Sequence, residues 1–241
     1  MSKLKTLLAV IALAAACGVA QAQESSTSDK ARMQAIQLEA VVLITNAELM
    51  GRALFGSYMS RQPDDGAATQ AAKDTALAAA TDRCKTPYRA IRVRGYVPNV
   101  TQVDSIVIYL IGDASKQSVM LGRHYRVELS PDGKTVRSVV VSAKDCSELN
   151  LAALTGAQYI VNPLSSAPTE FHVFLNLLYK AKFRVRSAMG VWEIDNGEVK
   201  PLAFDPNYQP EKITVKDCVL PDGSRFATTE TACRKTGGIV Q

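Results

Sequence analysis

The stretch from Thr169 to Leu202 reads TEFHVFLNLLYKAKFRVRSAMGVWEIDNGEVKPL, and its pattern predicts the centre of the fold. We interpret it as four short strands joined by tight links. The Asn196-Gly197 pair predicts a type I′ hairpin turn, because both residues tolerate the positive φ angles that this turn requires. Consecutive hairpins form an antiparallel meander, and a meander with one apolar face needs other elements to cover it. The predicted strands are Glu170–Leu178, Phe183–Ser187, Val191–Ile194 and Glu198–Leu202.

The first 22 residues have the features of a secretory signal peptide. Lys3 and Lys5 precede an aliphatic run, and Ala20-Gln21-Ala22 has the small-x-small pattern that signal peptidases cut after. The aliphatic run is shorter than the roughly 20 apolar residues that span a bilayer. We therefore expect a periplasmic or secreted protein with no transmembrane segment. Processing at Cys17, as in a lipoprotein, is the less favoured alternative.

The length and charge of the chain indicate one core with a small appendage. Removing the signal peptide leaves 219 of the 241 residues and lowers the formal net charge from +5 to +3. A chain of this size is long enough to bury one sizeable core. We divide it into a signal peptide (1–22), a polar lead-in with a helical hairpin (23–87), an antiparallel sheet domain (88–204), and a linker with a C-terminal cysteine loop (205–241).

Two helices are predicted before the sheet. From Ala31 to about Tyr58, apolar residues recur at steps of three and four, which places them on one helix face. Ala67–Arg83 is rich in Ala and has a high helix propensity. The segment RQPDDG at 61–66 predicts a break between them. We expect the two helices to form a hairpin that packs on the sheet.

Further strands are predicted between the helices and the meander. The turn Pro131-Asp132-Gly133 predicts a hairpin with Gly in the left-handed position, and residues 144–158 are interpreted as a loop with a helical turn. The fold class is therefore α+β, with a helical hairpin packed on a mainly antiparallel sheet and a disulfide-bearing C-terminal appendage. The additional strands are Ala90–Val97, Ser105–Ile111, Leu121–Ser130 and Thr135–Ser142.

Four cysteines remain after signal cleavage: Cys84, Cys146, Cys218 and Cys233. An even number in an exported chain favours two disulfides, although sequence alone permits three pairings. Cys218 and Cys233 flank a turn in a segment with few apolar residues, so we expect them to pair with each other and Cys84 to pair with Cys146. A nucleophilic Cys146 is disfavoured, because its acidic neighbours would raise the pKa of its thiol.

Compact catalytic motifs, such as nucleotide-binding loops and H-E-x-x-H, do not occur in the sequence. We therefore predict a non-enzymatic interaction or binding module that needs no cofactor. The enzyme alternative is a hydrolase or metal-dependent activity centred on His124, His172 and Glu170, because Glu170 and His172 would share one strand face. A solvated polar face formed by His124, Arg126 and Glu128 explains His124 without a ligand, and we favour this interpretation.

Basic residues alternate along two predicted strands. If the strands are adjacent, they form a positive patch suited to anionic envelope polymers or lipids, which is the second alternative function. A solvated strand face with lysines at its edge explains the same pattern. Nucleic acid is disfavoured as a partner, and neither a protein partner nor the oligomeric state is specified by the sequence. The residues are Arg92, Arg94, Lys180, Lys182, Arg184 and Arg186.

Overall fold

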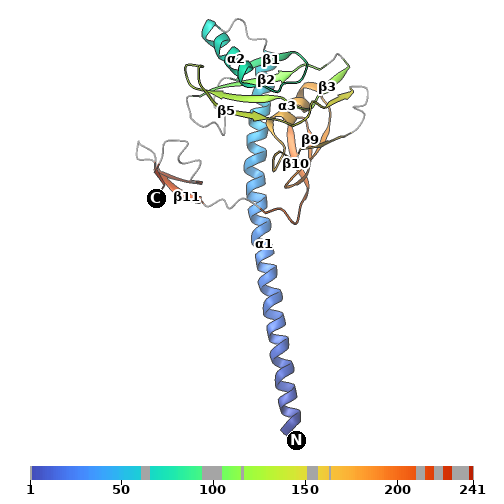
Figure 1. The fold of residues 1–241 in the computed structure, drawn as a ribbon. Helices are drawn as coiled ribbons and strands as arrows, with labels where there is room; N and C mark the ends of the chain where they lie inside the picture. The colour runs from blue at the N-terminus through green and yellow to red at the C-terminus, as the bar shows by residue number, and fades with distance from the viewer. Residues whose placement is uncertain are drawn as a thin grey trace.

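The computed structural model describes the backbone of residues 2–60, 66–93, 105–114, 117–150, 157–162, 164–209, 215–219, 225–229 and 239–240. Side chains are described within residues 29–209 of these ranges. Helices and antiparallel sheets alternate in layers, so the predicted α+β class is confirmed (Figure 1). Within the described residues, no helix combines the length and the apolar character needed to cross a bilayer.

The long helix α1 (Ser2–Met59) contains the predicted helix over Ala31–Tyr58. Its apolar residues at steps of three and four are buried, as the spacing predicts. The second predicted helix is α2 (Ala67–Ala79), which ends four residues before the predicted boundary at Arg83. The buried apolar residues of α1 are Ile36, Ala40, Ala47, Met50 and Leu54.

The first sheet is antiparallel and has the strand order β1-β2-β4-β5. Helix α2 covers one of its faces through Ala72 and Ala76, and α1 lies against the other. The two helices therefore pack on opposite faces of the sheet and not together as the expected hairpin. Both faces are therefore buried, which accounts for the nearly continuous apolar sequence of its second strand. The strands are β1 (Tyr88–Val93), β2 (Ile106–Gly112), β4 (Tyr125–Leu129) and β5 (Val136–Val141).

The hairpin between β4 and β5 confirms the predicted turn. Gly133 has a φ of 72°, which is the left-handed conformation that the Pro-Asp-Gly order predicts. The Asp132 carboxylate accepts hydrogen bonds from Ser130 Oγ and from the backbone N–H of Lys134. These local bonds define where the chain reverses.

The second sheet has the strand order β10-β9-β8-β7. Three of its strands are the last three strands of the predicted meander, and their link at Asn196-Gly197 has φ angles of 52° and 75°, as a type I′ turn requires. The edge strand β7 is parallel to its neighbour, which the sequence analysis did not predict. The strands are β7 (Gln158–Val161), β8 (Phe183–Ser187), β9 (Gly190–Asp195) and β10 (Glu198–Phe204).

The predicted strand over Glu170–Leu178 is wrong, because these residues form helix α3 (Glu170–Tyr179). Every residue from Glu170 to Asn176 is buried, so the apolar residues follow no two-residue alternation and a short buried helix resembles a buried strand in sequence. The helix begins where the Thr169 backbone N–H donates to His172 Nδ1, and it ends at Lys180 in the left-handed conformation. Helix α3 connects the parallel strands β7 and β8, as such connections usually require.

Two short strands form within regions predicted to be irregular. In the predicted loop over 144–158, β6 (Glu148–Asn150) pairs with β3 (Ser118–Met120). Three more strands, β11 (Val215–Val219), β12 (Arg225–Thr229) and β13 (Ile239–Val240), form a small sheet in the C-terminal appendage. Cys233 lies outside the described residues, so its predicted bond to Cys218 stays a prediction.

Helices α1 and α3 lie between the two sheets (Figure 1). Their buried side chains meet those of β1 and β2 on one side and those of β8 and β9 on the other. The predicted Cys84–Cys146 disulfide is confirmed, with its Cα atoms 5.8 Å apart. The disulfide covalently links the segment after α2 to the segment before β6.

Candidate functional site

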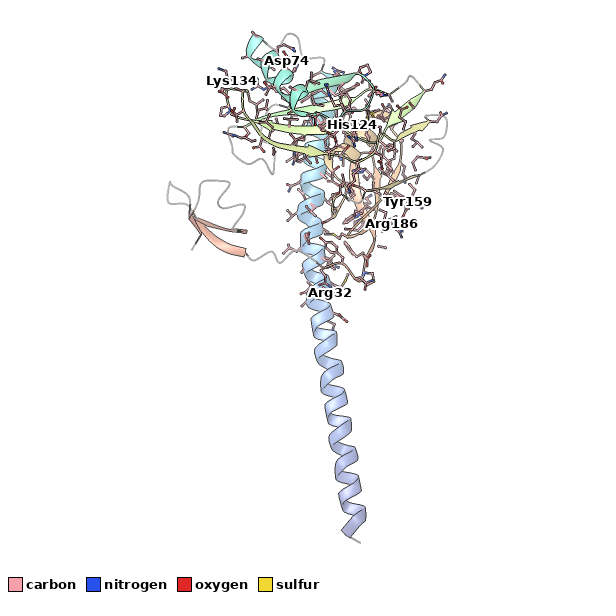
Figure 2. All side chains as sticks on the ribbon, in the orientation of Figure 1. Arg32, Asp74, His124, Lys134, Tyr159 and Arg186 are labelled. Atoms are coloured by element: carbon pink, nitrogen blue, oxygen red, sulfur yellow. A yellow bond between two sulfur atoms is a disulfide. The ribbon has the colours of Figure 1, made fainter. Side chains whose placement is uncertain are left out.

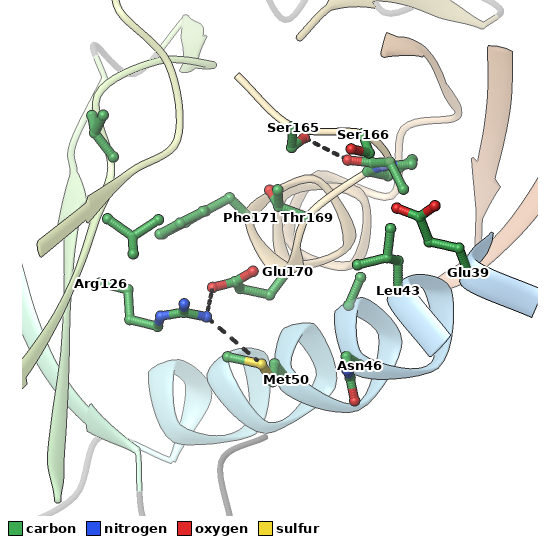
Figure 3. A pocket seen from close by; sticks show the side chains of 15 residues that line it. Glu39, Leu43, Asn46, Met50, Arg126, Ser165, Ser166, Thr169, Glu170 and Phe171 are labelled. Atoms are coloured by element: carbon green, nitrogen blue, oxygen red, sulfur yellow. Dashed lines mark hydrogen bonds and ion pairs between the residues drawn. The ribbon is translucent and has the colours of Figure 1, made fainter. Parts of the chain in front are cut away.

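A cleft of about 280 Å³ opens between α1, strands β4 and β5, and the loop that leads into α3 (Figure 3). This volume lies just below the range of about 300–1,000 Å³ that is usual for small-molecule sites. The cleft has an apolar lining and a few polar groups. The apolar side chains that line it include Leu43, Ala47, Met50, Val140, Val141 and Phe171.

At one end of the cleft, Arg126 of β4 forms an ion pair with Glu170 in the first turn of α3. The distance between Arg126 Nη1 and Glu170 Oε1 is 2.9 Å, and both side chains are largely buried. The Tyr109 hydroxyl lies 3.5 Å from the same carboxylate oxygen. Burial, together with the charge of Glu170, raises the pKa of Tyr109 well above its usual value, so the phenol stays protonated.

Glu39 of α1 lines another part of the cleft, and its side chain extends toward the loop at Ser165 and Ser166 (Figure 3). Only 6% of its surface is exposed. Its Oε1 atom accepts a hydrogen bond of 2.8 Å from the Tyr208 hydroxyl, whereas Oε2 has no hydrogen-bond partner among the described residues. Buried polar atoms are nearly always paired in folded proteins, so this oxygen is an unused buried acceptor in a side chain that lines the cleft.

Hydrogen bonds from the second sheet hold the loop before α3 in place. The indole N–H of Trp192 donates to Ser187 Oγ over 2.8 Å, and Ser187 Oγ–H donates to the Ser166 carbonyl over 2.6 Å. The Met189 backbone N–H donates to the same carbonyl. Within the segment that precedes α3, the Asn162 side-chain amide donates a hydrogen bond to Ser165 Oγ. The wall of the cleft is therefore preformed.

No family model, curated protein or solved structure matched this chain. The chemistry of the cleft is therefore inferred from its own side chains. One buried carboxylate has a free acceptor, a second carboxylate is neutralised by Arg126, and apolar side chains line the space. Hydrogen bonds and an ion pair to the surrounding elements fix these polar groups in place.

The predicted solvated face of β4 is wrong, because α1 and α3 cover it. His124 and Glu128 are buried, and Arg126 is largely buried. The ring of His124 donates from Nε2 to the Met120 carbonyl and accepts at Nδ1 from the Gly112 backbone N–H, which assigns the neutral Nε2–H tautomer. Burial lowers its pKa to about 4. His124, labelled in Figure 2, therefore has both ring nitrogens occupied by structural hydrogen bonds.

The structure brings His172 near His124, but His172 and Glu170 each have another partner. His172 Nδ1 accepts from the backbone N–H and the hydroxyl of Thr169, so it caps α3. Burial, and secondarily the neighbouring His124, lowers the pKa of His172 to about 4. Within the described ranges, no group of three His, Cys, Asp or Glu side chains is arranged to hold a metal ion.

The predicted basic residues lie on two different sheets. Arg92 donates to Thr69 on the α2 side of the first sheet, and Arg94 is outside the described residues. On the second sheet, Lys182 lies 3.0 Å from Asp195, and Arg184 lies 3.5 Å from Glu193.

Among the remaining basic residues, Lys180 ends α3 in the left-handed conformation. Arg186 is exposed on the outer surface together with Tyr159 (Figure 2). The acidic residues of β9 thus neutralise much of the positive charge that the sequence places along β8.

Glu39 and Tyr208 were not predicted from the sequence. Glu39 occurs inside the apolar stripe of α1, one turn from both Ile36 and Leu43, and a charged residue in a stripe of this kind was the available signal. No pattern in the sequence marks Tyr208 as its partner, because 169 residues separate the two. The contact depends on tertiary structure alone.

Proposed function

We propose that the protein is a non-enzymatic binding module and that the cleft between α1, β4, β5 and the loop before α3 receives its ligand. The observation that carries this proposal is the buried Glu39 carboxylate, which belongs to a residue that lines the cleft and whose Oε2 atom has no hydrogen-bond partner among the described residues. An unpaired buried acceptor costs stability of about 1–3 kcal/mol. A ligand that donates a hydrogen bond to Oε2 would recover this free energy. Ligand binding therefore gives a reason for a buried carboxylate at this position.

Two observations favour binding over catalysis. The three residues of the enzyme alternative, His124, His172 and Glu170, are each held by hydrogen bonds or an ion pair that stabilise the fold. Both histidines have pKa values of about 4, which makes them weak bases at neutral pH. Binding of anionic polymers by β8 is less favoured, because Lys182 and Arg184 are paired with acidic residues.

We also propose that the protein acts outside the cytoplasm. The Cys84–Cys146 disulfide supports this, because disulfides persist in oxidising compartments. The expected processing after Ala22 is tested by the mass of the protein recovered from the periplasm of an expressing bacterium. A chain starting at Gln23 supports the proposal, a lipidated Cys17 assigns it to the membrane surface, and an unprocessed chain in the cytoplasm contradicts it.

Two neighbouring valines on β5 provide a test of the cleft. Val140 lines the cleft and is 39% exposed, whereas Val139 does not line it and is 43% exposed. Trp fits a strand well, so Val140→Trp should fill the cleft without unfolding the protein, and Val139→Trp is the matched control. The assay is ligand-observed NMR with a fragment library that contains cationic, zwitterionic, neutral and anionic members.

We expect at least one fragment class to bind saturably to the parent protein and to Val139→Trp, and to lose binding in Val140→Trp. Unfolding midpoints of both variants would show that the fold is retained. The proposal is overturned if no fragment binds the parent protein, or if Val140→Trp binds every fragment as well as the parent does.

A further inference from the structure

Resting on the function proposed above, we infer that the ligand group bound in the cleft is a primary ammonium on an aliphatic stem. Among the described residues, three charged side chains line the cleft: Glu39, Glu170 and Arg126. Arg126 and Glu170 neutralise each other across 2.9 Å, so Glu39 provides the uncompensated charge. A cationic group is therefore the complement of this site, because a buried carboxylate is stable when it is paired.

The hydrogen bonding of Glu39 selects among cations. Its Oε1 atom accepts the Tyr208 hydroxyl, and its buried Oε2 atom has no hydrogen-bond partner among the described residues. A guanidinium binds a carboxylate best as a bidentate group that uses both oxygens. A bidentate guanidinium would have to share Oε1 with the Tyr208 hydroxyl, whereas an ammonium is a compact charge that can bind at Oε2 alone.

The walls of the cleft explain the aliphatic stem. Leu43, Ala47 and Met50 of α1 line the space, and Val140 of β5 faces it. Aliphatic chains that end in an ammonium bury their methylene groups along such surfaces. The Arg126–Glu170 pair has no net charge to attract a cation, so the ammonium should lie at Glu39 and the stem should extend along the apolar walls.

Two sources can supply this chemistry: a free alkyl amine or diamine, and a lysine side chain of a peptide. The probes are therefore cadaverine and Nα-acetyl-lysine methylamide. Nα-acetyl-arginine methylamide tests the preference for ammonium over guanidinium, and 1-pentanol is the neutral control of similar shape. Titration calorimetry or NMR of the full mature chain measures each affinity at low and at high salt.

We expect both ammonium probes to bind more tightly than 1-pentanol and more tightly than the arginine derivative. Glu39→Gln should weaken ammonium binding roughly 10- to 100-fold, because a charge-assisted hydrogen bond contributes about 1.5–3 kcal/mol. Gln keeps an oxygen for the Tyr208 hydroxyl, so the fold should be retained. Glu48→Gln is the matched control, because Glu48 is another α1 carboxylate that accepts the Val199 N–H outside the cleft.

A second variant tests the role assigned to Tyr208. Tyr208→Phe frees the Oε1 atom of Glu39 and should raise the affinity for the arginine derivative relative to the lysine derivative. A structural role alone would lower both affinities together. Tighter binding of the lysine derivative than of cadaverine assigns the natural ligand to a peptide, and the reverse order assigns it to a free amine.

The inference is overturned if 1-pentanol binds as well as the ammonium probes, or if Glu39→Gln binds them unchanged. It is also overturned if the fragment screen finds only anionic or neutral ligands in the cleft, and in that case the proposed binding function stands. A parent protein that binds no fragment and no ammonium probe contradicts both proposals.

Discussion

Arg126 and Glu170 form an ion pair of 2.9 Å that joins the first sheet to the first turn of α3. Both side chains are largely buried, and the Tyr109 hydroxyl lies beside the carboxylate. The pair links two layers of the fold at one end of the proposed ligand cleft. Its loss should therefore affect both the stability of the protein and the shape of the cleft.

Replacing Arg126 with Met should lower the free energy of unfolding by about 3–5 kcal/mol, because Glu170 is left buried without its counter-charge. Urea unfolding monitored by Trp192 fluorescence would measure the change. The double variant Arg126→Met/Glu170→Met should lose much less than the sum of the single variants, because neither charge is left unpaired. A loss below about 1 kcal/mol in Arg126→Met alone would show that the pair contributes little.

The two histidines predict a loss of stability in mild acid. Their folded pKa values of about 4 lie below the usual value of 6.5, so the neutral rings favour the folded state. This stabilisation is fully present above about pH 6.5 and is lost as the pH falls toward 4. The loss should be on the order of 3 kcal/mol per histidine.

Urea unfolding at pH 7 and at pH 4.5 tests this pH dependence. His124→Gln should be less stable than the parent at pH 7, since it breaks the bonds to Met120 and Gly112. It should also show a smaller difference between the two pH values, because one of the titrating groups is gone. If the free energy of unfolding of His124→Gln changes between the two pH values as much as that of the parent does, other groups cause the acid sensitivity.

Two glycines of α1 provide a matched pair for the contact between α1 and α3. A Cβ atom on Gly51 would lie 2.6 Å from Val173 Cβ, whereas a Cβ on Gly56 would have no neighbour within 4 Å. Gly51→Ala should destabilise the protein by about 1–3 kcal/mol, because the helices must separate. Gly56→Ala should stabilise it by about 0.5–1 kcal/mol through helix propensity. Thermal unfolding of both variants checks the opposite signs.

The Cys84–Cys146 disulfide closes a long segment of 62 residues. In the chain-entropy model, a loop of this length contributes about 4 kcal/mol, so Cys84→Ser/Cys146→Ser should lower the free energy of unfolding by up to that amount. Peptide mapping without reduction should recover the Cys84–Cys146 peptide, and the same experiment tests the predicted Cys218–Cys233 bond. Free thiols at Cys84 and Cys146 in protein from the periplasm would contradict the pairing.

Local signals in the sequence were sufficient to predict most of the elements. Apolar residues at helical spacing predict the buried face of α1, and Asn196-Gly197 and Pro131-Asp132-Gly133 predict two turns with the observed positive φ angles. These patterns are reliable because they depend on backbone sterics and on residues near one another in the chain. The α+β class follows from the same local patterns.

Tertiary structure alone determined the state of Glu170–Tyr179 and the site itself. A short segment that is buried all round has no periodicity to separate helix from strand, so its state depends on packing between the two sheets. For the same reason, the sequence could not distinguish a solvated His124 and Arg126 from buried ones. The contacts of Glu39 with Tyr208, and of Arg126 with Glu170, join residues far apart in the chain. Only the folded arrangement of α1, α3 and both sheets creates the cleft, because burial and charge pairing are properties of the assembled layers.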